Sequence, residues 1–201
     1  FGKDYILMSK FVLIDGHSIL NRAFYGVPIF TNSEGLHTNA VFGFLNIMFK
    51  IIDSKQPDYM AVAFDVHQPT FRHEMFKDYK GTRKPMMEEL REQVPVIKEL
   101  LQKMNITTVE LPGYEADDVI GTLSKKGEKA GMEVDVISGD RDLLQLASDH
   151  ITICIPKTKK GQTTVEEYNT EGVRKLYKVT PTEFIDVKAL MGDSSDNIPG
   201  V

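Results

Sequence analysis

The chain has 201 residues, 41% of them hydrophobic, and its 29 acidic residues outnumber 24 Lys and Arg. A chain of this length buries roughly 70% of its unfolded surface, so we expect one sizeable core and a single domain. No apolar run approaches the ~20 residues that span a bilayer, and the opening FGKDYIL is too short for a signal peptide. These features predict a cytoplasmic protein without a membrane partner.

Strand-like and helical patterns alternate along the chain. Residues 1–9 are expected to be a disordered lead or an expression remnant, with Met8 as a candidate native start. Apolar, β-prone runs predict strands at 11–15, 59–65, 106–111, 134–140 and 151–156. Helical spacing predicts helices at 39–53, 86–104, 116–130 and 141–148, and a last one beginning at Pro181. This order predicts an α/β fold with a mostly parallel central sheet flanked by helices.

Nine carboxylates form five short clusters, and most of the clusters follow a predicted strand. Parallel strands end along one rim of a sheet, so acids placed there converge although they are distant in sequence. Such a cluster requires cations, and oxygen ligands suit hard ions such as Mg²⁺ or Mn²⁺. Helix N-caps would explain single acids but neither their number nor their common rim. The nine are Asp15, Asp65, Glu115, Asp117, Asp118, Asp140, Asp142, Asp193 and Asp196. The chain therefore looks like a metal-dependent enzyme acting on phosphate esters.

The net charge of −5 does not exclude a nucleic-acid partner. Without the nine clustered acids, the rest of the chain has an excess of four positive charges. Two divalent ions bound at the acidic rim would add four more, which favours contact with a polyanion.

Six sequence segments, in order, resemble a known family. They are FVLIDGHSILNRAF, AVAFD, FRHEMFKDYKGTRKP, PGYEADDVIGTL, VISGDRDLLQL and KALMGDSSDNIPGV. Together they resemble the 5′-nuclease domains of bacterial DNA polymerase I, which belong to the flap endonuclease superfamily with its PIN-like fold. The resemblance covers residues 10–201 and implies that the chain stops at the start of a helix–hairpin–helix element that holds duplex DNA.

The resemblance implies roles for the acids. Asp15, Asp65, Glu115 and Asp117 match a tighter metal site, whereas Asp140, Asp142 and Asp193 match a second one. Asp118 and Asp196 match acids that act through water or between the sites. Two Mg²⁺ ions, replaceable by Mn²⁺, would activate water and stabilise the leaving oxygen. The residues expected to be catalytic are Asp15, Asp65, Asp117, Asp140 and Lys80.

Basic and aromatic residues alternate between positions 71 and 84. Cations grip phosphate, and aromatic rings stack on unpaired bases. The resemblance implies that this segment is part of a helical arch over the site and that Arg22, on the helix after the first strand, holds a phosphate. A solvated connector, and a surface salt bridge for Arg22, are the alternatives. The expected nucleic-acid-binding residues are Arg22, Arg72, Lys77, Lys80, Arg83 and Lys84.

The implied function is that of a metal-dependent 5′–3′ exonuclease and 5′-flap endonuclease in primer removal and repair. Its expected partners are DNA with a 5′ flap or 5′ end and RNA–DNA hybrids; we expect a monomer, and a polymerase domain in the intact protein.

A haloacid-dehalogenase-type phosphatase fits poorly, because His17 stands where such an enzyme needs a second acid. A PIN-type ribonuclease and a non-catalytic nucleic-acid-binding module remain alternatives. His17, His67 and His73 have no assigned role, since their spacing matches no His-based metal motif.

Overall fold

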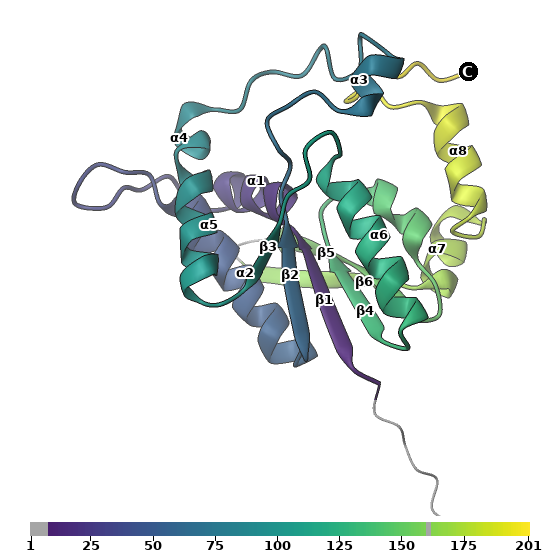
Figure 1. Cartoon of the computed structure of the whole chain (residues 1–201), viewed down its shortest axis with the longest axis horizontal. Coiled ribbons are helices and arrows are strands. Elements are labelled where there is room, and N and C mark those ends of the chain that lie inside the picture. The colour runs from purple at the N-terminus through teal and green to yellow at the C-terminus, as the bar shows by residue number, and fades with distance from the viewer. Residues whose placement is uncertain (1–7, 160–161) are drawn as a thin grey trace, which may run out of the picture.

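A six-stranded sheet forms the centre of the computed structural model, which describes residues 8–159 and 162–201 (Figure 1). Its strands lie in the order β3-β2-β1-β4-β5-β6, and only β6 runs antiparallel to its neighbour. Residues 1–7 of the expected lead lie outside the described residues. The strands are β1 (Lys10–Asp15), β2 (Tyr59–Ala63), β3 (Thr107–Val109), β4 (Glu133–Ile137), β5 (Ile151–Lys159) and β6 (Gln162–Tyr168).

Helices cover both faces of the sheet and enclose two apolar clusters (Figure 1). The first face packs against α1 (Gly16–Gly26), α2 (Asn39–Lys55) and α5 (Gln93–Lys103), where Val12, Phe44 and Ile97 are fully buried. The second packs against α6 (Ala116–Lys129), the 3₁₀ helix η1 (Arg141–Leu146), α7 (Thr170–Tyr177) and α8 (Glu183–Met191). Burial of alternate residues of β1 and β4 on opposite faces, as expected of parallel strands, explains the apolar run FVLI of β1 and the mostly apolar β4, in which the buried Asp135 is paired with Lys55.

The predicted fold class is confirmed, with differences at individual elements. The expected helix at 86–104 is divided into α4 (Glu88–Arg91) and α5, because Pro95 has no N–H to donate to the carbonyl group of Arg91. β2 and β3 are shorter than expected, and the 141–148 segment is a 3₁₀ helix. The sequence prediction lacked β6 and α7. β6 reads as the mainly polar run QTTVEEY, which forms a strand by pairing with β5 at the edge of the sheet.

The segment between β2 and α4 passes over the carboxyl ends of the strands (Figure 1). It is helical over α3 (Phe71–Met75) and continues in turns, so the expected arch is helical only in its first part. Hydrogen bonds tie it to the end of the chain: the Lys80 amide donates to the Asp196 carbonyl oxygen at 2.9 Å, and the Asn197 side chain donates to the Asp78 carbonyl oxygen at 2.9 Å. We call residues 71–84 the arch segment from here on.

Gly16 brings two of the acidic strand ends together. A Cβ at this position would lie 2.4 Å from the ring of Phe64, which is 1% exposed. Gly16 follows Asp15 and Phe64 precedes Asp65, so this close packing sets the spacing of the two carboxylates.

Gly16→Ala is therefore expected to destabilise the fold by about 1–3 kcal/mol, the usual cost of overpacking a core. Chemical denaturation measures this free energy of unfolding. Gly26→Ala, at the other end of α1, is the control, because nothing lies within 4 Å of its added Cβ. Equal stabilities of the two variants would contradict the packing argument.

Candidate active site

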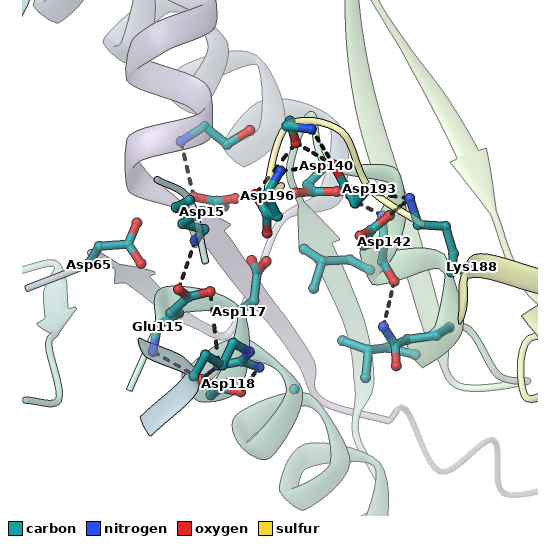
Figure 2. Close-up of a pocket in the computed structure, with 18 of the residues that line it drawn as sticks. Asp15, Asp65, Glu115, Asp117, Asp118, Asp140, Asp142, Lys188, Asp193 and Asp196 are labelled. Atoms are coloured by element: carbon teal, nitrogen blue, oxygen red, sulfur yellow. Dashed lines mark hydrogen bonds and ion pairs between the residues drawn. The ribbon is translucent and has the colours of Figure 1, made fainter. Parts of the chain in front are cut away.

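One cavity of about 1290 Å³ at the carboxyl ends of the strands contains all nine clustered acids (Figure 2). They come from five separate segments of the chain, at the ends of β1, β2 and β4, at the start of α6, and in the loop after α8. The structure therefore brings together every acid that the sequence singled out. Their roles in metal binding stay a prediction.

Asp15 and Asp65 form one side of the cavity. Asp15 is 5% exposed, ends β1 and caps α1 by accepting a hydrogen bond from the Ser18 amide at 3.0 Å. Its second oxygen accepts a hydrogen bond from the Ser138 hydroxyl at 2.7 Å. Asp65 lies two residues beyond β2 and accepts a hydrogen bond from the Ala116 amide at 2.8 Å. Both carboxylates are thus held in place by backbone and hydroxyl donors.

Asp117 lies at the centre of the acidic cavity (Figure 2). Burial, followed by the negative charges of Asp15, Asp140 and Asp65, raises its pKa to about 8. Burial also raises the pKa of Asp15 to about 6. Among the described residues, Asp117 has no hydrogen-bond donor or cation as a partner. The protein's own cations therefore do not offset the burial and the neighbouring carboxylates that act on Asp117.

The arch segment supplies cations and a hydroxyl group to the acids that begin α6. The Lys80 ammonium lies 2.7 Å from Glu115 Oε1, and the buried Tyr79 hydroxyl donates to Glu115 Oε2 at 3.0 Å. Arg72 binds both oxygens of Asp118, at 2.7 and 2.8 Å. Burial raises the pKa of Asp118, but the Arg72 guanidinium outweighs it and the net pKa lies below its usual value.

A second set of acids is tied together by Lys188 of α8. Its ammonium lies 2.9 Å from Asp142 and 3.4 Å from Asp193, so one cation bridges two carboxylates (Figure 2). Asp193 also accepts hydrogen bonds from the amide and hydroxyl groups of Ser195, which lower its pKa. Asp196 pairs with Arg83 of the arch segment and accepts a hydrogen bond from Tyr79 at 3.0 Å.

The donor set of the cavity fits hard divalent cations. All nine side chains offer carboxylate oxygens, the ligands that Mg²⁺ and Mn²⁺ prefer. Yet the described part of the chain contains no group of three His, Cys, Asp or Glu side chains whose positions could already hold a metal ion. Glu115, Asp118, Asp142, Asp193 and Asp196 are instead paired with Lys or Arg. These cations take up part of the acceptor capacity that the five carboxylates would offer to an ion.

The predicted nucleic-acid-binding residues divide into two groups. Arg72, Lys80 and Arg83 line the cavity, whereas Lys77 and Lys84 are exposed outside its lining. Arg22 also lies outside the lining, and its buried Nε has no hydrogen-bond partner among the described residues. Burial lowers the pKa of Arg22.

Sequence reasoning assigned four side chains no role in organising the acids. Ser138 holds Asp15, and the Tyr79 hydroxyl links Glu115 to Asp196. Lys188 bridges two acids, and His17 Nδ1 accepts a hydrogen bond from the Asp65 amide at 3.1 Å. All four stand within the six segments that carry the resemblance, but their partners are distant in sequence or, for Lys188, include Asp142 of another segment.

Comparison with known proteins places this cavity in a family. Residues 10–178 match the family model described as 5′-3′ exonuclease, N-terminal resolvase-like domain. The chain belongs to this 5′–3′ exonuclease family. It is 53% identical over 195 residues to DNA polymerase I of Bacillus caldotenax and 54% identical over 192 residues to that of Bacillus subtilis. These alignments cover 97% and 96% of the chain but 22% of each relative.

Solved structures of nucleases share the fold of this exonuclease domain. The bacteriophage T5 5′-exonuclease with bound divalent zinc superposes with a TM-score of 0.75 at 26% identity. The T5 flap endonuclease in a pseudo-enzyme-product complex with DNA and metal ions gives 0.74 at 26% identity. Both matches cover 96% of this chain and 70% of the other. Human GEN1, at 15% identity, shares the fold alone, with a TM-score of 0.61 over 97% of this chain and 47% of the other. The predicted nuclease class is confirmed, and no helix in residues 8–159 and 162–201 is long and apolar enough to cross a membrane.

Proposed function

We propose that this domain hydrolyses phosphodiester bonds near the 5′ ends and 5′ flaps of DNA, and of RNA strands in RNA–DNA hybrids, with two Mg²⁺ ions. The observation that carries the proposal is the convergence of nine acids from five segments around Asp117, whose pKa is raised to about 8 by burial and then by the surrounding carboxylates. Divalent ions are the cofactors that compensate such a cavity and act on phosphate. We propose that Mn²⁺ can replace Mg²⁺.

Two groups of acids would hold the ions. Asp15, Asp65, Glu115 and Asp117 would hold one, and Asp140, Asp142 and Asp193 the other; Asp118 and Asp196 would act through water or between the sites. When bound, the ions supply a hydroxide nucleophile and neutralise the charge of the departing 3′ oxygen. Ser18 and Ser138 keep Asp15 oriented, and Ala116 keeps Asp65 oriented.

The arch segment would hold the substrate against the acids. Lys80 and Arg83 place positive charge over the cavity, where they would contact the phosphates beside the scissile bond. The exposed rings of Phe71 and Phe76 line the cavity and would stack on unpaired bases of the 5′ arm, whereas the ring of Tyr79 is buried. We propose that the domain acts as a monomer, joined in the intact protein to a polymerase as the name of its relatives indicates.

The test is cleavage of a 5′-flap duplex labelled in turn at the 5′ and the 3′ end of the flap strand. We expect cleavage with Mg²⁺ or Mn²⁺ that yields 5′-phosphate and 3′-hydroxyl products, and no cleavage in excess chelator. A matched substrate with an RNA flap strand tests the hybrid specificity. Undiminished activity in chelator, or absence of cleavage with either ion, would overturn the proposal.

A further inference from the structure

A row of residues on α6 lines the cavity but has no part in the proposed cleavage. Gly121, Thr122, Lys125, Lys126 and Lys129 follow Asp118 at helical spacing, so all of them lie toward one side of the helix. From Asp118 to Lys129 the helix rises about 16 Å, long enough to follow several phosphates of a DNA strand. The cavity thus continues from the acids along a basic helix face.

The lysines differ in how they are held. Lys125 is fixed by Glu128 at 3.1 Å and by the Leu146 carbonyl oxygen at 3.5 Å. Lys126 and Lys129 are exposed, and in the described part of the chain neither forms an ion pair. Gly121 and Thr122, nearer the acids, are small and leave room for a close approach of the ligand. Two ammonium groups are therefore available to a polyanion that already lies over the acids.

The two sides of the cavity differ in chemistry. The arch segment contributes the exposed aromatic rings of Phe71 and Phe76, whereas the lining residues of α6 include none. Aromatic rings bind unpaired bases, but lysines bind the phosphate backbone and do not depend on accessible bases. The arch side suits a single strand, and the α6 side suits a backbone whose bases are paired.

We propose that Lys126 and Lys129, together with Lys125, bind the phosphate backbone of the duplex that adjoins the cleavage point. This inference rests on the proposed function, because it assigns the α6 face to one part of the same substrate. A purely structural role for the lysines is the competing explanation, since cations in the last turn of a helix stabilise its dipole.

The experiment measures DNA binding by the double variant Lys126→Gln/Lys129→Gln. Fluorescence anisotropy with Ca²⁺ in place of Mg²⁺ gives affinities for a blunt duplex and for a single strand at several salt concentrations. For the duplex, we expect the slope of log K against log salt to fall by about 0.9 per lysine, about 1.8 in total. Single-strand binding should stay unchanged.

Two further variants separate charge from fold. Lys103→Gln removes a lysine from the last turn of α5, outside the cavity, and should bind both DNAs like the wild type. Lys126→Arg/Lys129→Arg keeps the charges and should retain the wild-type slope. If the double Gln variant does not fold, each single Gln variant should lower the duplex slope by about 0.9.

An unchanged duplex slope would overturn the inference, as would an equal loss for single strand and duplex. Failure of the proposed function is distinguishable, because it would leave the wild type unable to cleave a flap while the duplex slope still responds to Lys126 and Lys129.

Discussion

Asp117→Asn is expected to abolish cleavage and, at the same time, to make the metal-free domain more stable at neutral pH. The variant keeps the size of the side chain but removes the ionisable carboxyl group at the centre of the acidic cavity. Loss of a ligand that helps to bind divalent ions removes several kcal/mol of transition-state stabilisation, so turnover should fall at least roughly a thousandfold.

The gain in stability follows from the raised pKa of Asp117. An aspartate normally loses its proton near 3.8, but burial and the surrounding carboxylates raise this pKa to about 8. Between these values the unfolded chain releases a proton that the folded chain keeps, so the free energy of unfolding falls as the pH rises from about 4 to 8. Asn cannot titrate, so the free energy of unfolding of the variant should fall less as the pH rises. At pH 8 the variant should be more stable than the wild type by on the order of 2 to 5 kcal/mol.

Denaturant unfolding in excess chelator at several pH values measures the effect on stability. Asp186→Asn is the matched control, because Asp186 is an exposed carboxylate of α8 outside the cavity. Asp186→Asn should change neither turnover nor the pH dependence of the free energy of unfolding. Wild-type turnover in Asp117→Asn, or a pH dependence equal to that of the wild type, would show that the charge at the centre of the cavity has been misjudged.

Lys80→Met should lower turnover by roughly a hundredfold to a thousandfold, the loss typical of removing one group that stabilises transition-state charge. The ammonium of Lys80 lies 2.7 Å from Glu115 Oε1, so it stands directly over the acidic cavity. Met keeps the unbranched stem and removes only the charge. The metal-free fold should also lose stability, because the nearly buried Glu115 loses its nearest cation, although it keeps its hydrogen bond from Tyr79.

A second variant, Lys80→Gly, separates the effect of the Lys80 charge from that of its backbone conformation. Lys80 has a φ of 56°, a left-handed conformation that glycine adopts without strain. Lys80→Gly therefore relieves the backbone while it removes the ammonium, and an equal loss of turnover in the Gly and Met variants would assign the effect to the charge.

Single-turnover cleavage of a 5′-flap substrate measures the loss. Lys175→Met is the matched control, since Lys175 is an exposed lysine of α7 outside the cavity lining, and it should cleave like the wild type. Equal effects of Lys80→Met and Lys175→Met would indicate that the arch segment acts only as a connector.

The sequence alone was enough to predict the parallel part of the sheet and the position of its acids. β1 contains the apolar run FVLI, and β4 is apolar except for Glu133 and Asp135, because these strands are buried on both faces; such patterns are visible without any knowledge of contacts. Asp15 stands at the end of one run, and Asp140 stands three residues after the other. Since parallel strands end along one rim, these two acids had to converge once the strands paired.

Weaker local signals left other elements unpredicted. β6 is mostly polar and is a strand only because β5 offers it an antiparallel partner at the sheet edge. The division between α4 and α5 depends on Pro95. A proline can interrupt a helix, but it is also tolerated in a helix's first turn, so the residue alone did not predict the division. The arch segment has no strong helical period beyond α3, so its path over the cavity is set by contacts with Asp196 and Asn197.

Only the tertiary structure decided which cation meets which acid. Arg72 binds Asp118 across 46 positions of the sequence, and Tyr79 reaches Asp196 across 117. Side chains at such separations meet because the sheet places five loops along one edge, and nothing in the spacing of residues encodes those pairs. The same is true of Asp117: its residue type was plain in the sequence, but its raised pKa arises from burial and from the carboxylates that folding gathers around it.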